Sequence, residues 1–341
     1  MKPTETVSRA LPDPSVIIEL AVAYRSSMIL FTAVEVGVFT QLAEAPLTAT
    51  DLAERTGTEP RPLEMLLNAC VAYKLLNRNG RCYMNTRAAD TFLVAGKKAF
   101  IGSGLKYSED LYPAWGQLST LVRTNRPIVP TEEYTGQDPE KTRNFVYGMH
   151  NRTLGISAAL PYGVDLTGRK RLLDVGGGPG TYSIILVRAT EGLHSTVMDL
   201  PGVIEISREI IESYKLTDRI DTLPGSYLTD EFKSGNDVVL LSGMMHRETA
   251  ETCQHLLGKA FGSLEDGGIV VVSDVFFDDE SHDQPVFATH FALNMMLTSD
   301  DGSAHGKTEM AAWMKEAGFA EVEVKDLPQP NPHSLVIGIK P

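Results

Sequence analysis

The second half of the chain, from about residue 165, alternates short apolar runs with segments of helical period. Strands that alternate with helices form a parallel sheet covered by helices on both faces. The last two apolar runs are separated only by the short loop PQPNPH, which favours antiparallel pairing at one edge. The sequence therefore predicts an α/β fold, a doubly wound and mostly parallel sheet. The predicted strands are RLLDV (171–175), STVMDL (195–200), RIDTLPG (219–225), DVVLL (237–241), GIVVVSDV (268–275), EVEVKDL and SLVIGIK.

A glycine-rich loop follows the first of these strands and reads Asp174-Val175-Gly176-Gly177-Gly178-Pro179-Gly180. Glycines permit a tight turn and a close approach of a ligand to the backbone. The loop lies at the carboxyl edge of the predicted sheet, where doubly wound folds bind ligands. The dinucleotide pattern G-x-G-x-x-G would need a glycine at the position of Thr181, so the pattern here is D-x-G-x-G-x-G. An acid before the loop suits a cationic ammonium group better than a pyrophosphate.

A second acid, Asp199, ends the next predicted strand. In this type of fold, that position meets a ribose, whose two hydroxyls donate to one carboxylate. The loop and the two acids together indicate a site for a nucleoside that carries an amino acid, which is S-adenosylmethionine.

Several motifs in a fixed order now identify a resemblance. LLDVGGGPG, MDLPGVIE and DRI…PGSY follow one another, with EAGF near the C-terminus and TAVEVGVFTQL, AWGQLSTLVRTNRP and NFVYGM before them. The chain resembles, over nearly its whole length, the S-adenosylmethionine-dependent O-methyltransferases typified by the plant caffeic acid enzymes, acetylserotonin methyltransferase and bacterial antibiotic-tailoring enzymes. The resemblance implies a class I methyltransferase fold that follows an N-terminal helical, winged-helix-like dimerisation domain.

The predicted organisation has three parts: a dimerisation domain (1–125), linking helices that line the substrate pocket (126–164) and a cofactor-binding catalytic domain (165–341). Within the first part, Thr50 or Asp51 is the expected cap of a short helix, and a longer helix is expected from Leu63 to Lys74. Asn79-Gly80 predicts a hairpin. A winged helix can bind DNA, but this longer helix is mostly apolar and lacks a set of base-reading side chains.

The resemblance also implies which residues hold the cofactor. Ser226 and Tyr227 fall where the family has Asp-Phe beside the adenine. Tyr227 keeps a ring that can stack on the adenine, whereas Ser226 lacks the carboxylate of the family's Asp. The full predicted set is Asp174, Gly176, Gly178, Asp199, Leu200, Ser226, Tyr227 and Ser242.

His246 falls where the family has its general base, in the stretch SGMMHRET. Methyl transfer to a hydroxyl needs an acceptor oxygen about 3 Å from the methyl carbon and a group that takes its proton. An imidazole, with an ordinary pKa of about 6.5, suits this role at neutral pH. Asp274 matches one of the acids that brace this histidine, shortened from Glu. The other bracing acid has no equivalent in GSAHGKT (302–308).

Arg247 stands where the family has Asp, and a natural use of this cation is to pair with a substrate carboxylate. The resemblance places further acceptor-binding residues on two segments. These are Tyr147, Met149, His150, His290, Asn294 and Met296.

The composition of the chain limits its possible partners and its cellular compartment. The formal net charge of −13 disfavours nucleic acid as a partner. The three cysteines are too scattered for a disulfide framework or a zinc site, so no metal is predicted and a reducing compartment is expected. The first residues do not resemble a signal peptide, and no apolar run approaches the roughly 20 residues of a membrane span. We therefore expect a cytoplasmic homodimer that acts on a small molecule.

Two alternatives to O-methylation remain open at this level. A thioether acceptor has no proton to remove, so His246 and Arg247 would only bind a carboxylate-bearing acid. A few members with this architecture methylate the sulfur of 4-methylthio-2-hydroxybutyrate in dimethylsulfoniopropionate synthesis. The other alternative is a non-enzymatic winged-helix regulator that senses the cofactor.

Overall fold

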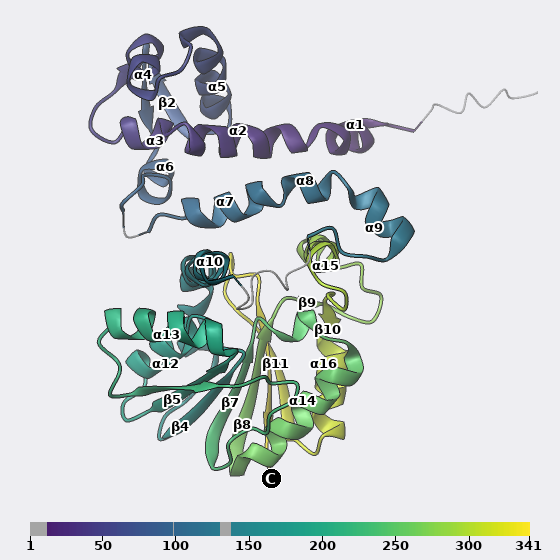
Figure 1. Cartoon of the computed structure of the whole chain (residues 1–341). Helices are drawn as coiled ribbons and strands as arrows, with labels where there is room; N and C mark the ends of the chain where they lie inside the picture. The colour runs from purple at the N-terminus through teal and green to yellow at the C-terminus, as the bar shows by residue number, and fades with distance from the viewer. Residues whose placement is uncertain (1–11, 98, 130–137) are drawn as a thin grey trace, which may run out of the picture. The chain divides into compact units, whose positions relative to one another are not determined.

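The computed structural model describes residues 12–97, 99–129 and 138–341. The chain forms two compact units, Met1–Glu109 and Asp110–Pro341, each with its own core (Figure 1). The division falls N-terminal to the predicted boundary at 125, because the helices that follow Asp110 pack on a helix of the second unit. The predicted boundary between linking helices and catalytic domain, at 164/165, does not separate two compact units. Residues 130–137 of the predicted linking segment lie outside the described residues.

The first unit packs its helices on a small three-stranded sheet in the order β1-β3-β2. The hairpin predicted at Asn79-Gly80 is confirmed by the antiparallel pairing of β2 with β3. The elements are α1 (Ser15–Val22), α2 (Tyr24–Glu35), α3 (Val38–Gln41), β1 (Leu47–Thr48), α4 (Ala49–Thr56), α5 (Pro60–Ala72), β2 (Leu76–Asn79), β3 (Cys82–Asn85), α6 (Arg87–Phe92) and α7 (Gly102–Asp110).

Two local predictions in this unit were wrong. Thr48, rather than Thr50 or Asp51, caps α4, and Asp51 at the third helical position returns the bond in a capping box. The helix α5 begins at Pro60 rather than at Leu63, because proline is well tolerated in the first turn, where the backbone N–H has no helical acceptor.

The expectation that no apolar run reaches a membrane-spanning length was also wrong. Helices α1 and α2 together form a 21-residue, mostly apolar helical segment, Ser15–Glu35. Few of its residues are buried within the chain, and the apolar side chains of Val16, Ile17, Ile18 and Leu20 are exposed. By length and composition alone this segment is long and apolar enough to cross a membrane.

The second unit is built on a seven-stranded sheet in the order β11-β12-β8-β7-β4-β5-β6. The five strands from β8 to β6 are mutually parallel. Strand β12 pairs antiparallel with β11, as the short connecting loop predicted, and it also pairs antiparallel with β8. The strands are β4 (Arg171–Val175), β5 (His194–Asp199), β6 (Ile220–Pro224), β7 (Asn236–Ser242), β8 (Leu264–Asp274), β11 (Ala320–Asp326) and β12 (Ser334–Ile339).

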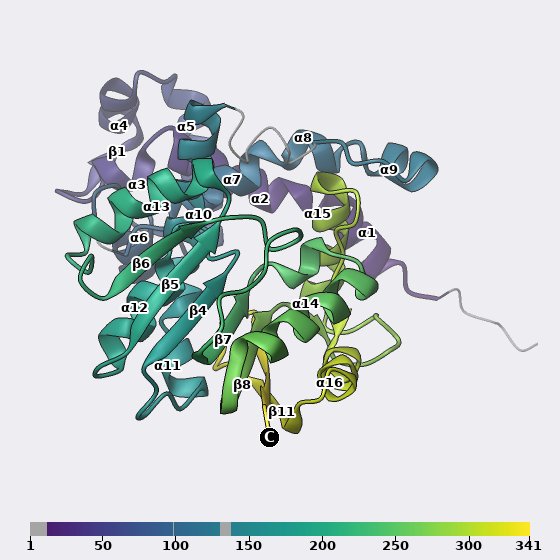
Figure 2. The same ribbon diagram turned by 60° about the horizontal axis from the view of Figure 1, so that its bottom comes forward.

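Helices cover both faces of this sheet (Figure 2). One core lies between the sheet and α10 to α13, and the other lies between the sheet and α14 and α16. The helices are α8 (Tyr112–Trp115), α9 (Leu118–Thr124), α10 (Pro139–Ser157), α11 (Leu160–Gly163), α12 (Thr181–Ala189), α13 (Pro201–Ser213), α14 (Ala250–Ser263), α15 (Val286–Thr298) and α16 (Lys307–Glu316). The predicted doubly wound α/β fold is confirmed.

The parallel direction of the strands brings several polar residues to one edge of the sheet. Strands β4, β5, β7 and β8 end there, and the start of antiparallel β12 lies at the same edge, since Ser334 pairs with Asp274. A 3₁₀ turn, η2 (Met245–Arg247), follows β7. A short parallel pair, β9 (Phe276–Phe277) with β10 (His305–Gly306), follows β8.

Candidate active site

The glycine loop makes its turn through left-handed backbone conformations. Gly176, Gly178 and Gly180 have φ values of +62°, +52° and +74°, which glycine adopts without strain. Gly177 is required for a different reason, because a Cβ there would lie 2.8 Å from the carboxyl carbon of Asp174. The loop therefore packs closely around this acid and leads directly into α12.

Asp199 is joined to the loop through the backbone. Its Oδ2 accepts from the Gly178 N–H at 2.8 Å, and its Oδ1 accepts from the Leu200 N–H at 2.7 Å. Burial raises the pKa of Asp199, and these two hydrogen bonds together with the charge of Arg247 oppose that rise. Each carboxylate oxygen keeps a further lone pair, so the group can still accept from the hydroxyls of a ribose.

Asp174 is fully buried at the end of β4. Its Oδ2 accepts from the Ser183 hydroxyl at 2.6 Å, and that hydroxyl also lies 2.8 Å from the Ser195 hydroxyl. Its Oδ1 has no hydrogen-bond partner among the described residues. Burial raises the pKa of Asp174 to about 7, and the nearby charge of Asp199 adds to the rise while the Ser183 hydrogen bonds oppose it.

Tyr227 lies against the glycine loop, within 3.5 Å of where a Cβ of Gly176 would stand. Its hydroxyl donates to Glu248 at 2.7 Å, and Lys259 holds its carbonyl oxygen at 2.7 Å. Ser226 instead makes local bonds: its backbone N–H donates to Asp230. The hydroxyl and the backbone carbonyl of Tyr227 are thus both held by contacts that the sequence reasoning did not predict.

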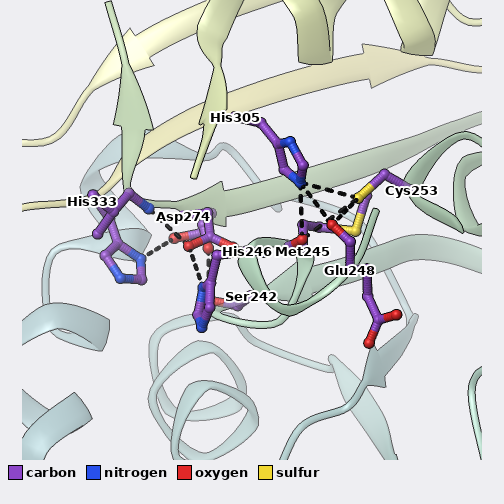
Figure 3. Close-up of polar contacts among 10 residues, drawn as sticks. Ser242, Met245, His246, Glu248, Cys253, Asp274, His305 and His333 are labelled. Atoms are coloured by element: carbon purple, nitrogen blue, oxygen red, sulfur yellow. Dashed lines mark hydrogen bonds and ion pairs between the residues drawn. The ribbon is translucent and has the colours of Figure 1, made fainter. Parts of the chain in front are cut away.

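His246 and Asp274 form a close pair at the ends of β7 and β8 (Figure 3). The distance from His246 Nδ1 to Asp274 Oδ1 is 2.7 Å, and their side chains are 12% and 2% exposed. Because a carboxylate only accepts, Nδ1 carries the proton, and in the neutral ring Nε2 keeps a lone pair that can accept a proton. Burial alone would raise the pKa of Asp274, but His246 above all, with His333 and the Val275 N–H, holds it below its ordinary value.

The turn that carries His246 is held from the opposite side. The Ser303 N–H donates to the His246 carbonyl at 2.8 Å, and His305 Nε2 lies 3.1 Å from the carbonyls of both Met245 and Glu248 (Figure 3). An imidazole that donates from Nε2 suits two carbonyl acceptors. The segment GSAHGKT, which supplies no bracing acid, therefore holds the backbone of the turn that carries His246 instead.

His333 is a second buried histidine at this edge, next to Asp274 in Figure 3. Its Nδ1 lies 3.1 Å from the Ser273 hydroxyl. Burial lowers the pKa of His333 to about 4, so this ring is neutral at physiological pH. The sequence reasoning missed His333, because only the pairing of β12 with β8, which was not predicted, brings the residue before Ser334 beside the end of β8.

The chain is similar to known methyltransferases along nearly its whole length. Residues 124–320 match the O-methyltransferase domain, and residues 18–95 match the O-methyltransferase dimerisation domain. The 3-hydroxy-5-methyl-1-naphthoate 3-O-methyltransferase of Streptomyces sahachiroi is 32% identical over 331 residues, which is 96% of this chain and 95% of the relative.

The chain belongs to the O-methyltransferase family.

A second relative, the tetracenomycin polyketide synthesis 8-O-methyl transferase of Streptomyces glaucescens, is also 32% identical, over 96% of this chain and 97% of its own. The structure of human N-acetylserotonin methyltransferase in complex with S-adenosylmethionine superposes with a TM-score of 0.85 at 25% identity, covering 98% and 99% of the two chains. The predicted methyltransferase fold and the predicted enzyme class are confirmed, and S-adenosylmethionine is the methyl donor of this family. Neither the sulfur-methylating alternative nor the regulator is supported by these relatives.

In this methyltransferase, α15 is the predicted acceptor-binding segment that contacts His246. The ring of Phe291 packs edge-on against the His246 ring, with centroids 4.8 Å apart. Asn294 accepts from the Trp115 indole N–H at 3.0 Å, which ties α15 to α8. Met296 is half-buried, whereas His290 is exposed.

The predicted residues on α10 have other partners. Both ring nitrogens of His150 are engaged, Nδ1 with the Thr181 hydroxyl at 2.8 Å and Nε2 with the Tyr214 hydroxyl at 3.2 Å. The Tyr147 hydroxyl donates to Glu209 at 3.3 Å. These contacts tie α10 to α12 and α13, while Met149 is half-buried on the same helix.

Arg247 is half-buried beside His246. Its positive charge lowers the pKa values of both Asp199 and Tyr227, so it lies within electrostatic reach of the residues predicted to hold the nucleoside. In the part of the chain that the structure describes, no group of three or more His, Cys, Asp or Glu residues is arranged to hold a metal ion.

Proposed function

We propose that this protein transfers a methyl group from S-adenosylmethionine to a hydroxyl of a small aromatic acceptor, with His246 as the general base. The observation that carries the proposal is the 2.7 Å contact between His246 Nδ1 and Asp274 Oδ1 at the edge of the sheet where the glycine loop and Asp199 also lie.

The residues at this edge fit the cofactor. The unpartnered Oδ1 of the buried Asp174 is an acceptor suited to the ammonium group of the amino acid end. Asp199 would accept from the ribose hydroxyls, and the Tyr227 ring would stack on the adenine. Gly176, Gly178, Leu200, Ser226 and Ser242 complete the proposed set. When bound, S-adenosylmethionine supplies an electrophilic methyl group on a sulfonium centre and leaves as S-adenosylhomocysteine.

His246 would take the proton of the acceptor hydroxyl on Nε2 as that oxygen forms its bond to the methyl carbon. The ring becomes an imidazolium, and the ionised Asp274 stabilises that charge through Nδ1. His305 and Ser303 keep the backbone of the turn in place while the ring changes its charge. The proton then leaves to solvent from the same nitrogen.

The acceptor class follows from the surroundings of the base and from the relatives. The edge-on Phe291 ring offers an apolar wall for an aromatic compound, and Asn294 and Met296 lie on the same helix. Two relatives at 32% identity carry names that specify aromatic or polyketide hydroxyls, and one of those acceptors is a naphthoate with a carboxylate. We propose that Arg247 pairs with such a carboxylate, and that Met149 and His290 contribute at the periphery of the acceptor site. Tyr147 and His150 would act indirectly, by positioning α10.

We further propose a cytoplasmic homodimer whose interface includes α1 and α2. The dimerisation-domain match covers most of this apolar segment, and the exposed side chains of Ile17 and Leu20 require a partner surface of the same character.

The test is a turnover assay with hydroxyaromatic compounds, with and without a carboxylate, alongside amines and thioethers. We expect hydroxyl acceptors to react and His246→Gln to lower kcat by about 10²- to 10⁴-fold. The affinity for S-adenosylhomocysteine should not change in this variant. His255→Gln, at an exposed position of α14, is the matched control and should behave as the wild type.

The proposal fails if His246→Gln retains kcat on the best hydroxyl acceptor, or if only thioethers or amines react. Arg247→Ala should raise KM for carboxylated acceptors and leave KM for their uncharged analogues unchanged. An equal rise in KM for both kinds of acceptor would contradict the proposed pairing of Arg247 with a carboxylate.

A further inference from the structure

The Tyr182 hydroxyl is a buried polar group that the proposed chemistry does not use. Tyr182 is the second residue of α12, directly after the glycine loop, and it is only 5% exposed. Its hydroxyl has no hydrogen-bond partner among the described residues. A phenylalanine would fill the same space without an unsatisfied hydroxyl, so the hydroxyl calls for an explanation beyond packing.

The neighbours of this hydroxyl place it among the strand ends. Burial raises the pKa of Tyr182, a weak hydrogen-bonding contact with Ser242 lowers it, the charges of Asp274 and Asp174 raise it further, and the charge of Arg152 lowers it. These residues come from the ends of β8, β4 and β7 and from α10. Ser242 is close, but its hydroxyl donates to the Ser273 carbonyl at 3.4 Å, and no hydrogen bond of good geometry joins it to the tyrosine.

Two unpartnered buried atoms therefore flank the same loop, namely Tyr182 Oη after it and Asp174 Oδ1 before it. One is a neutral donor and the other is an anionic acceptor when ionised. Between them begins α12, a nine-residue helix whose first backbone N–H groups have no acceptor within the helix and attract negative charge. A ligand end that carries one cationic donor and one anionic acceptor matches this combination.

We infer that Tyr182 binds the amino acid end of the cofactor, donating its hydroxyl to the carboxylate while Asp174 Oδ1 accepts from the ammonium group. The inference rests on the proposed use of this edge for S-adenosylmethionine, and it adds a ligand that neither the sequence motifs nor the family match assigned. Tyr182 is thus a cofactor-specificity residue that distinguishes nucleosides with an amino acid end from those without one.

The test compares Tyr182→Phe with the wild type by isothermal titration calorimetry against two probes. S-adenosylhomocysteine carries the amino acid end, and 5′-deoxy-5′-methylthioadenosine lacks it. We expect Tyr182→Phe to weaken S-adenosylhomocysteine by about 10- to 100-fold, the loss of one hydrogen bond to a charged group. Binding of methylthioadenosine should stay within about twofold, because the ribose and adenine contacts are retained.

The ligand-free variant provides an independent readout. Removing an unsatisfied buried hydroxyl should leave the thermal unfolding temperature of Tyr182→Phe equal to or above that of the wild type, while its stabilisation by saturating S-adenosylhomocysteine decreases. Tyr162→Phe, on the exposed tyrosine of α11, is the matched control and should bind both probes as the wild type does.

An equal loss of affinity for both probes would overturn the inference, because it would indicate a general disturbance of the site. Unchanged affinity for S-adenosylhomocysteine would overturn it as well, whether or not the KM for the acceptor rises. If the wild type binds neither probe, the proposed cofactor site itself fails, and that result is distinct from both of these.

Discussion

Replacing Asp274 with Asn isolates the contribution of one buried charge to the proposed base. Asp274 Oδ1 accepts from both His246 Nδ1 and the Val275 N–H, at 2.7 and 2.8 Å, so an amide oxygen is expected to keep this position. The amide NH₂ would then face the His246 backbone N–H, where Oδ2 now makes only a 3.3 Å contact. The variant therefore keeps the orientation of the ring and removes the negative charge behind it.

The size of the effect follows from the separation of the charges. An imidazolium and a carboxylate about 4 Å apart attract by about 4 kcal/mol at an effective dielectric constant near 20. That energy corresponds to about a 10³-fold change in rate if the whole charge develops on the ring in the transition state. Because partial proton transfer uses only part of it, we expect Asp274→Asn to lower kcat by about 10²- to 10³-fold. The affinity for S-adenosylhomocysteine should stay unchanged.

The assay measures initial rates of S-adenosylhomocysteine formation with acceptors that differ only in the acidity of their hydroxyl. An acceptor that is already ionised at the assay pH needs no base, so the loss in Asp274→Asn should shrink towards unity for the most acidic phenols. A loss of the same size for ionised and neutral phenols would refute the reasoning, and so would a kcat within about threefold of the wild type. Asp266→Asn, at the exposed opposite end of β8, is the matched control.

Three further predictions concern binding, stability and assembly. Because burial raises the pKa of Asp174 to about 7, calorimetric affinity for S-adenosylhomocysteine should fall by up to about tenfold per unit below pH 7 and level off above pH 8, and Asp174→Asn should remove this dependence. The lowered pKa of His333, about 4, contributes stability that is complete above pH 6.5 and is lost as the pH falls towards 4. The free energy of unfolding, measured in urea, should therefore change with pH by about 3 kcal/mol less in His333→Gln than in the wild type. An unchanged pH dependence would contradict this. Leu20→Arg, on an exposed apolar position of α1, should raise the dimer dissociation constant, measured by light scattering, at least about 100-fold. Glu19→Arg is the control and should leave it unchanged. A dimer that survives Leu20→Arg would exclude this part of α1 from the interface.

Some features of the site could be predicted because they depend on strand order and direction alone. Asp174, Asp199, His246 and Asp274 each stand at or just after the end of an apolar run, and parallel strands bring such ends to one edge. The Gly178–Asp199 and His246–Asp274 contacts agree with this convergence of strand ends, although the residues in each contact are up to 28 positions apart in the sequence.

Other features depend on side-chain packing and left no local pattern. His305 contacts the turn at 245–248 only because β10 pairs with β9, and a two-residue strand has no recognisable period. The engagement of His150 by Thr181 and Tyr214 depends on how α10 crosses α12 and α13. Thr48 was missed as a cap because Thr50 and Asp51 also carry a side-chain oxygen that can accept from a helix N–H, and only backbone geometry separates the three.

The sequence by itself determined the doubly wound fold and the glycine loop with its two acids, since both follow from periodicity and spacing along the chain. The proposal of His246 as the base came from the family resemblance. The tertiary structure alone decided the surroundings of those groups: that His333 and His305 lie near His246, and that Asp174 and Tyr182 each bury a polar atom without a partner among the described residues. The physical reason is that burial and the direction of a side chain depend on contacts between elements distant in sequence. These contacts set the hydrogen bonds and pKa values through which the residues act.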